Sequence, residues 1–256
     1  MNIPYSQKNR QSVTILHTAD FHLTQSTEDV ISDDNAGLGD AFTTFKLLVD
    51  AANHLPVDLV LISGDLFDVY HPSREFISLV LDEFSRLCPP AIIIPGNHDC
   101  LGDTETFKMS DWSGKGMHPY VITHPLGETL EVPGLPVIVW GRAMVQHTPL
   151  FEPLKGLPSR NRGAWYVAMG HGFYYGQGES GYRASPIYAY QIRNANWDYL
   201  ALGHAHFHTD VSQGTVKAAY SGSPVPMWNS NAEVLLIELD GRRNEPVSVN
   251  IFSLGI

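Results

Sequence analysis

Five short blocks of chemically active side chains recur along the sequence, each directly after an apolar run. The blocks are Asp20-Phe21-His22, Gly64-Asp65-Leu66-Phe67-Asp68, Gly96-Asn97-His98-Asp99, Gly170-His171 and Gly203-His204-Ala205-His206. Carboxylates, imidazoles and a neutral amide oxygen together hold two divalent cations at a short separation without making them inert. The residue types therefore point to a dinuclear metal centre.

The carboxylate of the second block, Asp65, is the natural bridge between two cations. We expect the remaining ligands to divide into Asp20, His22 and His206 at one site and Asn97, His171 and His204 at the other. Taken alone, each block is more typical of a turn or a helix cap, because Asp and Asn bond to the local backbone. Five blocks in this order, each at a strand end, favour the metal centre.

Short apolar runs alternate with helical patterns between these blocks. Runs at residues 13–17, 57–62, 91–94, 137–140, 165–169 and 199–202 predict buried strands. Residues 40–54 and 73–87 predict amphipathic helices, the second capped by Ser73. Residues 216–252 alternate as short strands, with turns at 221–226 and Asp240-Gly241. We expect an α/β fold, a two-sheet mixed β-sandwich flanked by helices, whose strand ends bring the blocks together.

Composition indicates a folded globular chain and restricts its partners. The 256 residues are 43% hydrophobic and 17% charged, and we expect one domain over residues 1–256. The net charge of −11 repels polyanions, so charge alone does not imply nucleic acid. The chain has two cysteines, Cys88 and Cys100, and we find no signal peptide or membrane span. These features predict a cytoplasmic protein without membrane contact.

The five blocks, from residue 20 to residue 206, resemble the motifs of the calcineurin-like metallophosphoesterase family. The resemblance implies a four-layer α/β/β/α sandwich, two divalent ions (Mn first, with Fe, Zn or a mixture as alternatives) and hydrolysis of phosphomonoesters or phosphodiesters. Two such cations acidify a water for in-line attack on phosphorus. We expect His98, which neighbours Asn97, to protonate the leaving group and Asp68 to orient its imidazole.

Residues 16–23, 64–76 and 198–224 are most similar to the DNA double-strand-break-repair exonucleases of that family. This similarity implies a manganese-dependent phosphodiesterase acting on DNA with an ATPase partner. We expect no capping domain and no ATPase-docking helices, because the sequence after His206 only completes the sandwich. Residues 142–193 are locally basic, and we expect DNA contacts through Arg160, Arg162 and Arg183 and base stacking by the aromatics of residues 173–183.

The aromatic residues of 173–183 are equally consistent with packing on the scaffold. Two alternative functions also stay open. A cluster of acidic residues beside the first block opposes a long DNA track and favours nucleotides or another small phosphoester as substrate. The cluster comprises Glu28, Asp29, Asp33, Asp34 and Asp40. The alternative of another class is a metal-stabilised scaffold or binding module with little activity. His17 and His208 adjoin the blocks. We expect a strand position for the first, and for the second either a loop position or a place behind the ligands, rather than ligand roles.

Overall fold

A computed structural model describes residues 10–24, 41–69, 71–108, 112, 119–161, 163–226 and 231–255. Two groups of residues discussed above, the acidic cluster at residues 28–40 and Arg162, lie outside this described part.

The first sheet has six strands in the order β14-β13-β1-β2-β3-β4. Their bounds are β1 (Val13–Thr18), β2 (Leu59–Ser63), β3 (Ala91–Ile94), β4 (Tyr120–Val121), β13 (Glu233–Leu239) and β14 (Val247–Ser253). The four strands from β1 to β4 run parallel, whereas β13 pairs antiparallel with β1 and with β14. The carboxyl ends of β1, β2 and β3 therefore meet at one edge.

The second sheet also has six strands, in the order β11-β12-β10-β7-β6-β5. Their bounds are β5 (Glu128–Glu131), β6 (Val137–Gly141), β7 (Trp165–His171), β10 (Tyr199–Gly203), β11 (Thr209–Asp210) and β12 (Lys217–Tyr220). Strands β6, β7, β10 and β12 run parallel. A separate short pair joins β8 (Phe173–Tyr175) to β9 (Pro186–Tyr188). The carboxyl ends of β7 and β10 thus also lie side by side.

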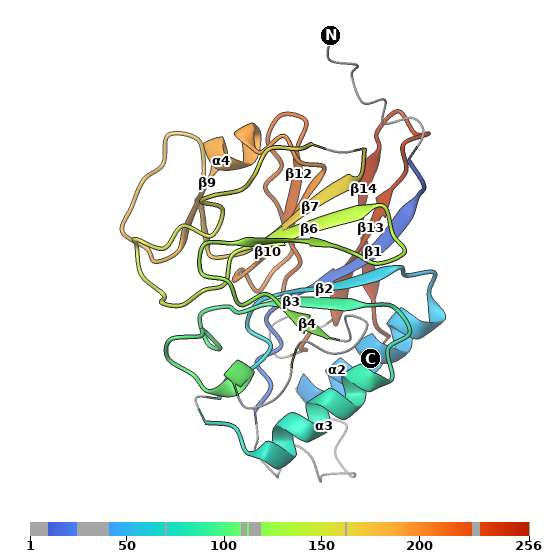
Figure 1. Ribbon diagram of the computed structural model, residues 1–256, viewed down its shortest axis with the longest axis vertical. Coiled ribbons are helices and arrows are strands. Elements are labelled where there is room, and N and C mark those ends of the chain that lie inside the picture. Colours follow the sequence, from blue (N-terminus) through green and yellow to red (C-terminus); the bar gives the residue numbers. More distant parts are fainter. Residues whose placement is uncertain are drawn as a thin grey trace.

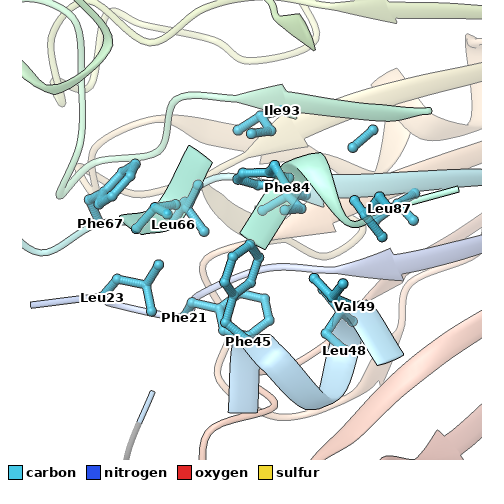
Figure 2. Packing of buried hydrophobic residues seen from close by; sticks show 14 of the residues in the cluster. Phe21, Leu23, Phe45, Leu48, Val49, Leu66, Phe67, Phe84, Leu87 and Ile93 are labelled. Carbon is cyan, nitrogen blue, oxygen red and sulfur yellow. The ribbon is translucent and has the colours of Figure 1, made fainter. Parts of the chain in front are cut away.

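Two helices, α2 (Ala41–His54) and α3 (Arg74–Ser85), cover the outer face of the first sheet (Figure 1). Ser73 begins α3 as expected, since its side chain accepts a hydrogen bond of 3.1 Å from the Phe76 amide. The two helices meet through aromatic rings. Figure 2 shows Phe45 of α2 between Phe21 and Phe84, whose ring centroids lie 5.5 and 4.9 Å away in edge-on contacts. This packing supports the loop that follows β1.

The two sheets stack face to face over a second apolar layer, which includes Ile15 and Leu61 on one side and Val167 and Ala201 on the other. A third layer covers the outer face of the second sheet, where loops and the six-residue helix α4 (Ala189–Asn194) pack. The expected two-sheet α/β sandwich is therefore confirmed. The helices lie mainly on the first sheet, and the fourth layer is largely loop. A 3-10 turn, η2 (Thr106–Lys108), is a further short helical segment of the described residues.

The strands expected from apolar runs are all present, with bounds shifted by at most two residues. Both amphipathic helices are present too, and the turn at Asp240-Gly241 lies between β13 and β14. Within the described residues, none of the helices has the length and apolar content needed to cross a bilayer.

Candidate metal centre

The five blocks lie at the ends of β1, β2 and β3 from the first sheet and of β7 and β10 from the second. Most of their expected ligands form two neighbouring clusters, and within each cluster the ligand atoms lie within 4.8 Å of one another. The clusters are Asp20, His22 and His206, and Asp65, His171 and His204. Hydrogen bonds bring the remaining expected ligand, Asn97, to the second cluster.

In the first cluster the backbone holds the carboxylate and leaves the imidazoles facing each other. The His204 amide donates to both oxygens of Asp20, at 3.2 and 3.0 Å. The Nε2 atoms of His22 and His206 are 3.3 Å apart. Two neutral imidazole nitrogens meet so closely only when a proton or a cation lies between them, because their lone pairs repel. This arrangement suits a shared metal ion.

In the second cluster the amide oxygen of Asn97 lies 3.0 Å from His171 Nε2 and 2.9 Å from His204 Nδ1. His171 Nδ1 is 2.8 Å from the Ser63 carbonyl oxygen. Because a carbonyl only accepts, this contact places a proton on Nδ1 and leaves Nε2 of the neutral ring to bind a cation. Asp65 Oδ2 is 3.2 Å from the same Nε2.

Asp65 is electrostatically linked to both clusters, as a bridging carboxylate must be. Burial raises its pKa, but the opposing effects of His171 and His22 and of the His98 amide are larger, so the pKa falls below its usual range. The same ion pair raises the pKa of His171 against the effect of burial. A cation would replace the proton that this pair shares.

The backbone at the centre is strained. Four residues of the centre adopt a positive φ that side chains rarely permit, at a cost of about 1–3 kcal/mol each. They are Asp20 (φ 59°), His22 (52°), Asp65 (52°) and His204 (106°). Gly96 has a different reason to be glycine, because a Cβ atom there would lie 2.1 Å from the Asp65 carboxylate. The surrounding fold therefore holds the ligands in conformations that the free chain avoids.

The buried carboxylates of this region favour the binding of cations. Asp20, Asp65 and Asp99 are at most 1% exposed, and no Lys or Arg among the described residues forms an ion pair with them. Burial, reinforced by the charge of Asp65, raises the pKa of Asp20. Burial also lowers the pKa of His22 to about 4 and that of His204 to about 3, so both rings are neutral at neutral pH. Buried carboxylates beside neutral imidazoles fit two divalent cations.

His98 and Asp68 lie at the solvent side of the first cluster. His98 Nδ1 is 2.8 Å from Asp68 Oδ1, and the two side chains are 42% and 45% exposed. The His98 ring meets His22 edge-on at 4.6 Å. The expected acid and its partner therefore adjoin the expected metal ligands. Both also belong, with His22, to a third group of possible ligand atoms within 4.8 Å.

Sequence reasoning assigns no role to two residues of this region. Asp99 is fully buried and accepts hydrogen bonds from the amides of Gly96, at 2.7 Å, and Phe67, at 3.2 Å, which ties the second block to the third. It is the last residue of the third block, so its motif already contains the signal. The other residue, His147, lies 5.8 Å from His204 between ring centroids. It stands six residues beyond β6, too far to be recognised as a strand-end residue.

His17 and His208 lie outside the ligand clusters. His17 is fully buried in β1, with Nδ1 2.9 Å from the Tyr199 hydroxyl. His208 Nδ1 is 3.1 Å from the Tyr220 carbonyl oxygen.

The arginines expected to contact DNA differ in their surroundings. Arg160 pairs with the buried carboxylate of Asp198 at 3.0 Å and is itself 16% exposed. Arg183 stacks over the Phe173 ring at 4.3 Å and forms no ion pair within the described part of the chain. Of these two side chains, Arg183 therefore has the charge that is available to a ligand.

A two-sheet sandwich with a candidate two-cation site at its strand ends fits the class of metal-dependent hydrolases. The model of the calcineurin-like phosphoesterase family matches residues 13–208, and this chain belongs to that family. The family uses a dinuclear divalent metal centre.

Two curated relatives are similar over most of this chain. The DNA double-strand break repair protein Mre11 of Saccharolobus solfataricus is 28% identical over 86% of this chain and 57% of its own length. The uncharacterized metallophosphoesterase YhaO of Bacillus subtilis is 26% identical over 82% of this chain and 53% of its own length. The chain therefore spans little more than half the length of either. The solved structure of TT1561 of Thermus thermophilus shares the fold, with a TM-score of 0.58 at 14% identity, and covers 95% of this chain and 100% of its own.

Proposed function

We propose that this chain is a phosphodiesterase whose two cations, Mn first, are bound by the two ligand clusters of the candidate centre. Asp65 would serve both cations, Asp20, His22 and His206 would hold one of them, and Asn97, His171 and His204 would hold the other. The observation that carries this proposal is the convergence of these donor atoms at buried carboxylates that have no Lys or Arg partner among the described residues.

When bound, the cations supply an acidified water and neutralise the charge of the phosphoryl oxygens. The chain's own residues orient the ester and handle the proton of the leaving group. His98 stands beside the ligands with one ring nitrogen fixed by Asp68, so its other nitrogen can donate a proton to the departing oxygen. Asp68 positions this ring.

A hollow beside the second cluster supports an organic group of limited size. It has a volume of about 310 Å³ and is lined by His204, Phe173, Tyr174, Arg183, Thr209 and Tyr220, among others. This volume lies at the low end for small-molecule sites. A hollow of this volume suits one ring of a nucleotide or an organic group of another small diester. This favours a small phosphoester over a polynucleotide as the substrate. Arg183 supplies a cationic face for that group.

A nuclease activity is the other form of this proposal. Its support is the relationship to Mre11, whose printed name refers to DNA double-strand break repair. The net charge of −11 and the ion pair of Arg160 oppose a long DNA track, so Arg183 is the arginine on which DNA binding would depend. An ATPase partner, a single domain over residues 1–256 and a cytoplasmic location stay predictions.

The decisive experiment compares manganese-dependent hydrolysis of bis-p-nitrophenyl phosphate with cleavage of linear single- and double-stranded DNA. Metal-stripped wild type and Asp65→Ala test the centre, and Asp82→Ala, which replaces an exposed carboxylate of α3 that belongs to none of the ligand blocks, is the matched control. We expect manganese-dependent diester hydrolysis that is lost in Asp65→Ala and kept in Asp82→Ala.

The DNA-cleavage assays distinguish the two candidate substrates. Cleavage of DNA together with the diester, both lost in Asp65→Ala, would support the nuclease. Diester hydrolysis with intact DNA would support the small-substrate enzyme. No hydrolysis of any diester or of DNA would contradict the phosphodiesterase proposal and favour a phosphomonoesterase or a metal-stabilised scaffold.

A further inference from the structure

His147 lies against the second ligand cluster and has no role in the proposed mechanism so far. Its ring is tilted by 46° to that of His204, at 5.8 Å between centroids. Asp65, His171 and His98, all members of the centre or its immediate neighbours, lie within electrostatic range of it. His147 is absent from the groups of possible metal ligands among the described residues. It therefore borders the space in front of the second cluster without belonging to the ligand set.

The loop that carries His147 is held on two sides. The carbonyl oxygens of Met144 and Val145 accept hydrogen bonds of 2.9 and 3.0 Å from the amides of Leu101 and Gly102, directly after the third block. Gly102 approaches so closely that a Cβ atom there would lie 2.2 Å from the Val145 oxygen. Met144 also packs in a small apolar cluster with buried Cys100. The His147 loop is therefore fixed to the loop of Asn97 and His98.

Ser185 holds the His147 ring itself. Its hydroxyl lies 3.1 Å from His147 Nδ1, and its amide donates to the Thr148 carbonyl oxygen at 2.9 Å. Ser185 is fully buried and has a φ of +52°, a strained conformation for a residue with a Cβ atom. Its carbonyl oxygen also accepts from the Phe173 amide at 3.0 Å. A strained, buried residue with these bonds presents its hydroxyl in one place.

The contact with Ser185 leaves one nitrogen of the imidazole available. Ser185 is the one hydrogen-bond partner of the His147 ring in the described part of the chain, and it engages Nδ1. The oxygens of a phosphodiester only accept hydrogen bonds. The tautomer that binds them carries its proton on Nε2. The Ser185 hydroxyl, which also lies 3.7 Å from Met144 Sδ, then donates to Nδ1, because an imidazole nitrogen is a stronger acceptor than a thioether sulfur. The device thus presents one oriented N–H donor beside the second cluster.

His98 and His147 occupy different ends of the candidate centre. His98 packs on His22 of the first cluster, whereas His147 packs on His204 of the second. A phosphoryl group held between the clusters therefore has an imidazole on either side. The His98 side is assigned to the leaving group, which leaves the oxygens of the phosphoryl group itself for His147.

We propose that His147 binds a phosphoryl oxygen of the substrate through Nε2–H at the second cluster, and that Ser185 is the residue that positions its ring. This inference rests on the proposed function and adds a substrate-binding residue to it. A donor fixed before the substrate arrives stabilises charge that grows on the phosphoryl oxygens during attack, because no reorientation is needed at that moment.

The test compares His147→Phe, which keeps a ring but no donor, with His147→Gln, which keeps a donor. Three quantities are measured on the manganese-loaded proteins: the manganese content, the Kd of inorganic phosphate by calorimetry, and kcat/KM for bis-p-nitrophenyl phosphate. We expect His147→Phe to lose about 10- to 100-fold in kcat/KM, the range for a hydrogen bond to a charged group. Its phosphate affinity should fall as well, with unchanged manganese content, and His147→Gln should stay within about fivefold of wild type.

Ser185→Gly removes the hydroxyl without imposing strain, because glycine adopts a positive φ freely. We expect a smaller loss than in His147→Phe, with no further loss when the two changes are combined. Asn196→Gly is the matched control, since Asn196 has a similar φ of 51°. It should leave kcat/KM unchanged.

Unaltered phosphate affinity and kcat/KM in His147→Phe would overturn the inference, and so would a loss of manganese in that variant, which would make His147 part of the metal site. If wild type hydrolyses no diester, the proposed function fails, yet the phosphate titrations of wild type and His147→Phe still decide whether His147 binds the anion.

Discussion

The acid role of His98 can be separated from the orienting role of Asp68 by the size of the rate loss that each substitution causes. Both side chains are more than 40% exposed, so their contact at 2.8 Å is a surface ion pair at most. Such pairs stabilise by about 0.2–1 kcal/mol, which limits the effect of Asp68→Asn on the rate to about fivefold. Loss of a general acid costs about 100- to 10,000-fold when the leaving group needs a proton. We therefore expect His98→Ala to be far more damaging than Asp68→Asn.

The assay uses two diesters of similar shape, bis-p-nitrophenyl phosphate and diphenyl phosphate. p-Nitrophenolate departs readily without a proton, whereas phenolate is a poorer leaving group. We expect His98→Ala to lose at least about 100-fold in kcat on diphenyl phosphate and only a few-fold on the nitrophenyl ester. An equal loss on both esters would refute the acid role. A loss in Asp68→Asn as large as that in His98→Ala would refute the orienting role and favour a third cation bound by His22, Asp68 and His98.

Three further predictions concern ligand binding, pH and packing. If DNA is bound, Arg183→Gln should weaken binding and reduce its salt dependence in a filter-binding titration, whereas Arg160→Gln should have a clearly smaller effect, because Asp198 holds that largely buried guanidinium against the protein. Burial lowers the pKa of His17 to about 3, so the neutral ring stabilises the metal-free protein fully above about pH 6.5. This stabilisation is lost as the pH falls, by about 2 kcal/mol at pH 5. Urea titrations of a His17→Phe, Tyr199→Phe variant should show a correspondingly flatter pH dependence of the free energy of unfolding. Phe45→Ala should lower the free energy of unfolding by about 3–5 kcal/mol in the same assay, and Phe45→Leu by clearly less.

The strands and the convergence of the ligands could be predicted because both are recorded in local sequence. Buried parallel strands are continuous apolar runs, so the expected bounds of β3, residues 91–94, are those of the structure. The glycines before Asp65 and Asn97 mark places where the chain turns sharply or passes close to another side chain. Such local signals need no knowledge of distant contacts.

What could not be predicted depends on contacts between residues far apart in the chain. The availability of Arg183 and the pairing of Arg160 depend on what folds against each side chain, and both arginines look alike in the sequence. His147 joins the centre because its loop is fixed to residues 101–102 and to Ser185. The loop-rich outer layer of the second sheet has no helical periodicity to reveal it. Tertiary packing decided each of these features.

The division of the ligands between two sheets has a consequence for folding kinetics. Asp20, Asp65 and Asn97 follow strands of the first sheet, whereas His171 and His204 belong to the second. Neither sheet alone carries a complete site, so tight cation binding requires that the two sheets have already docked. If the sheets dock after the transition state for folding, bound cations stabilise the native state more than that transition state. We then expect manganese to slow unfolding strongly while it leaves the refolding rate nearly unchanged. The cations would slow the separation of the two docked sheets.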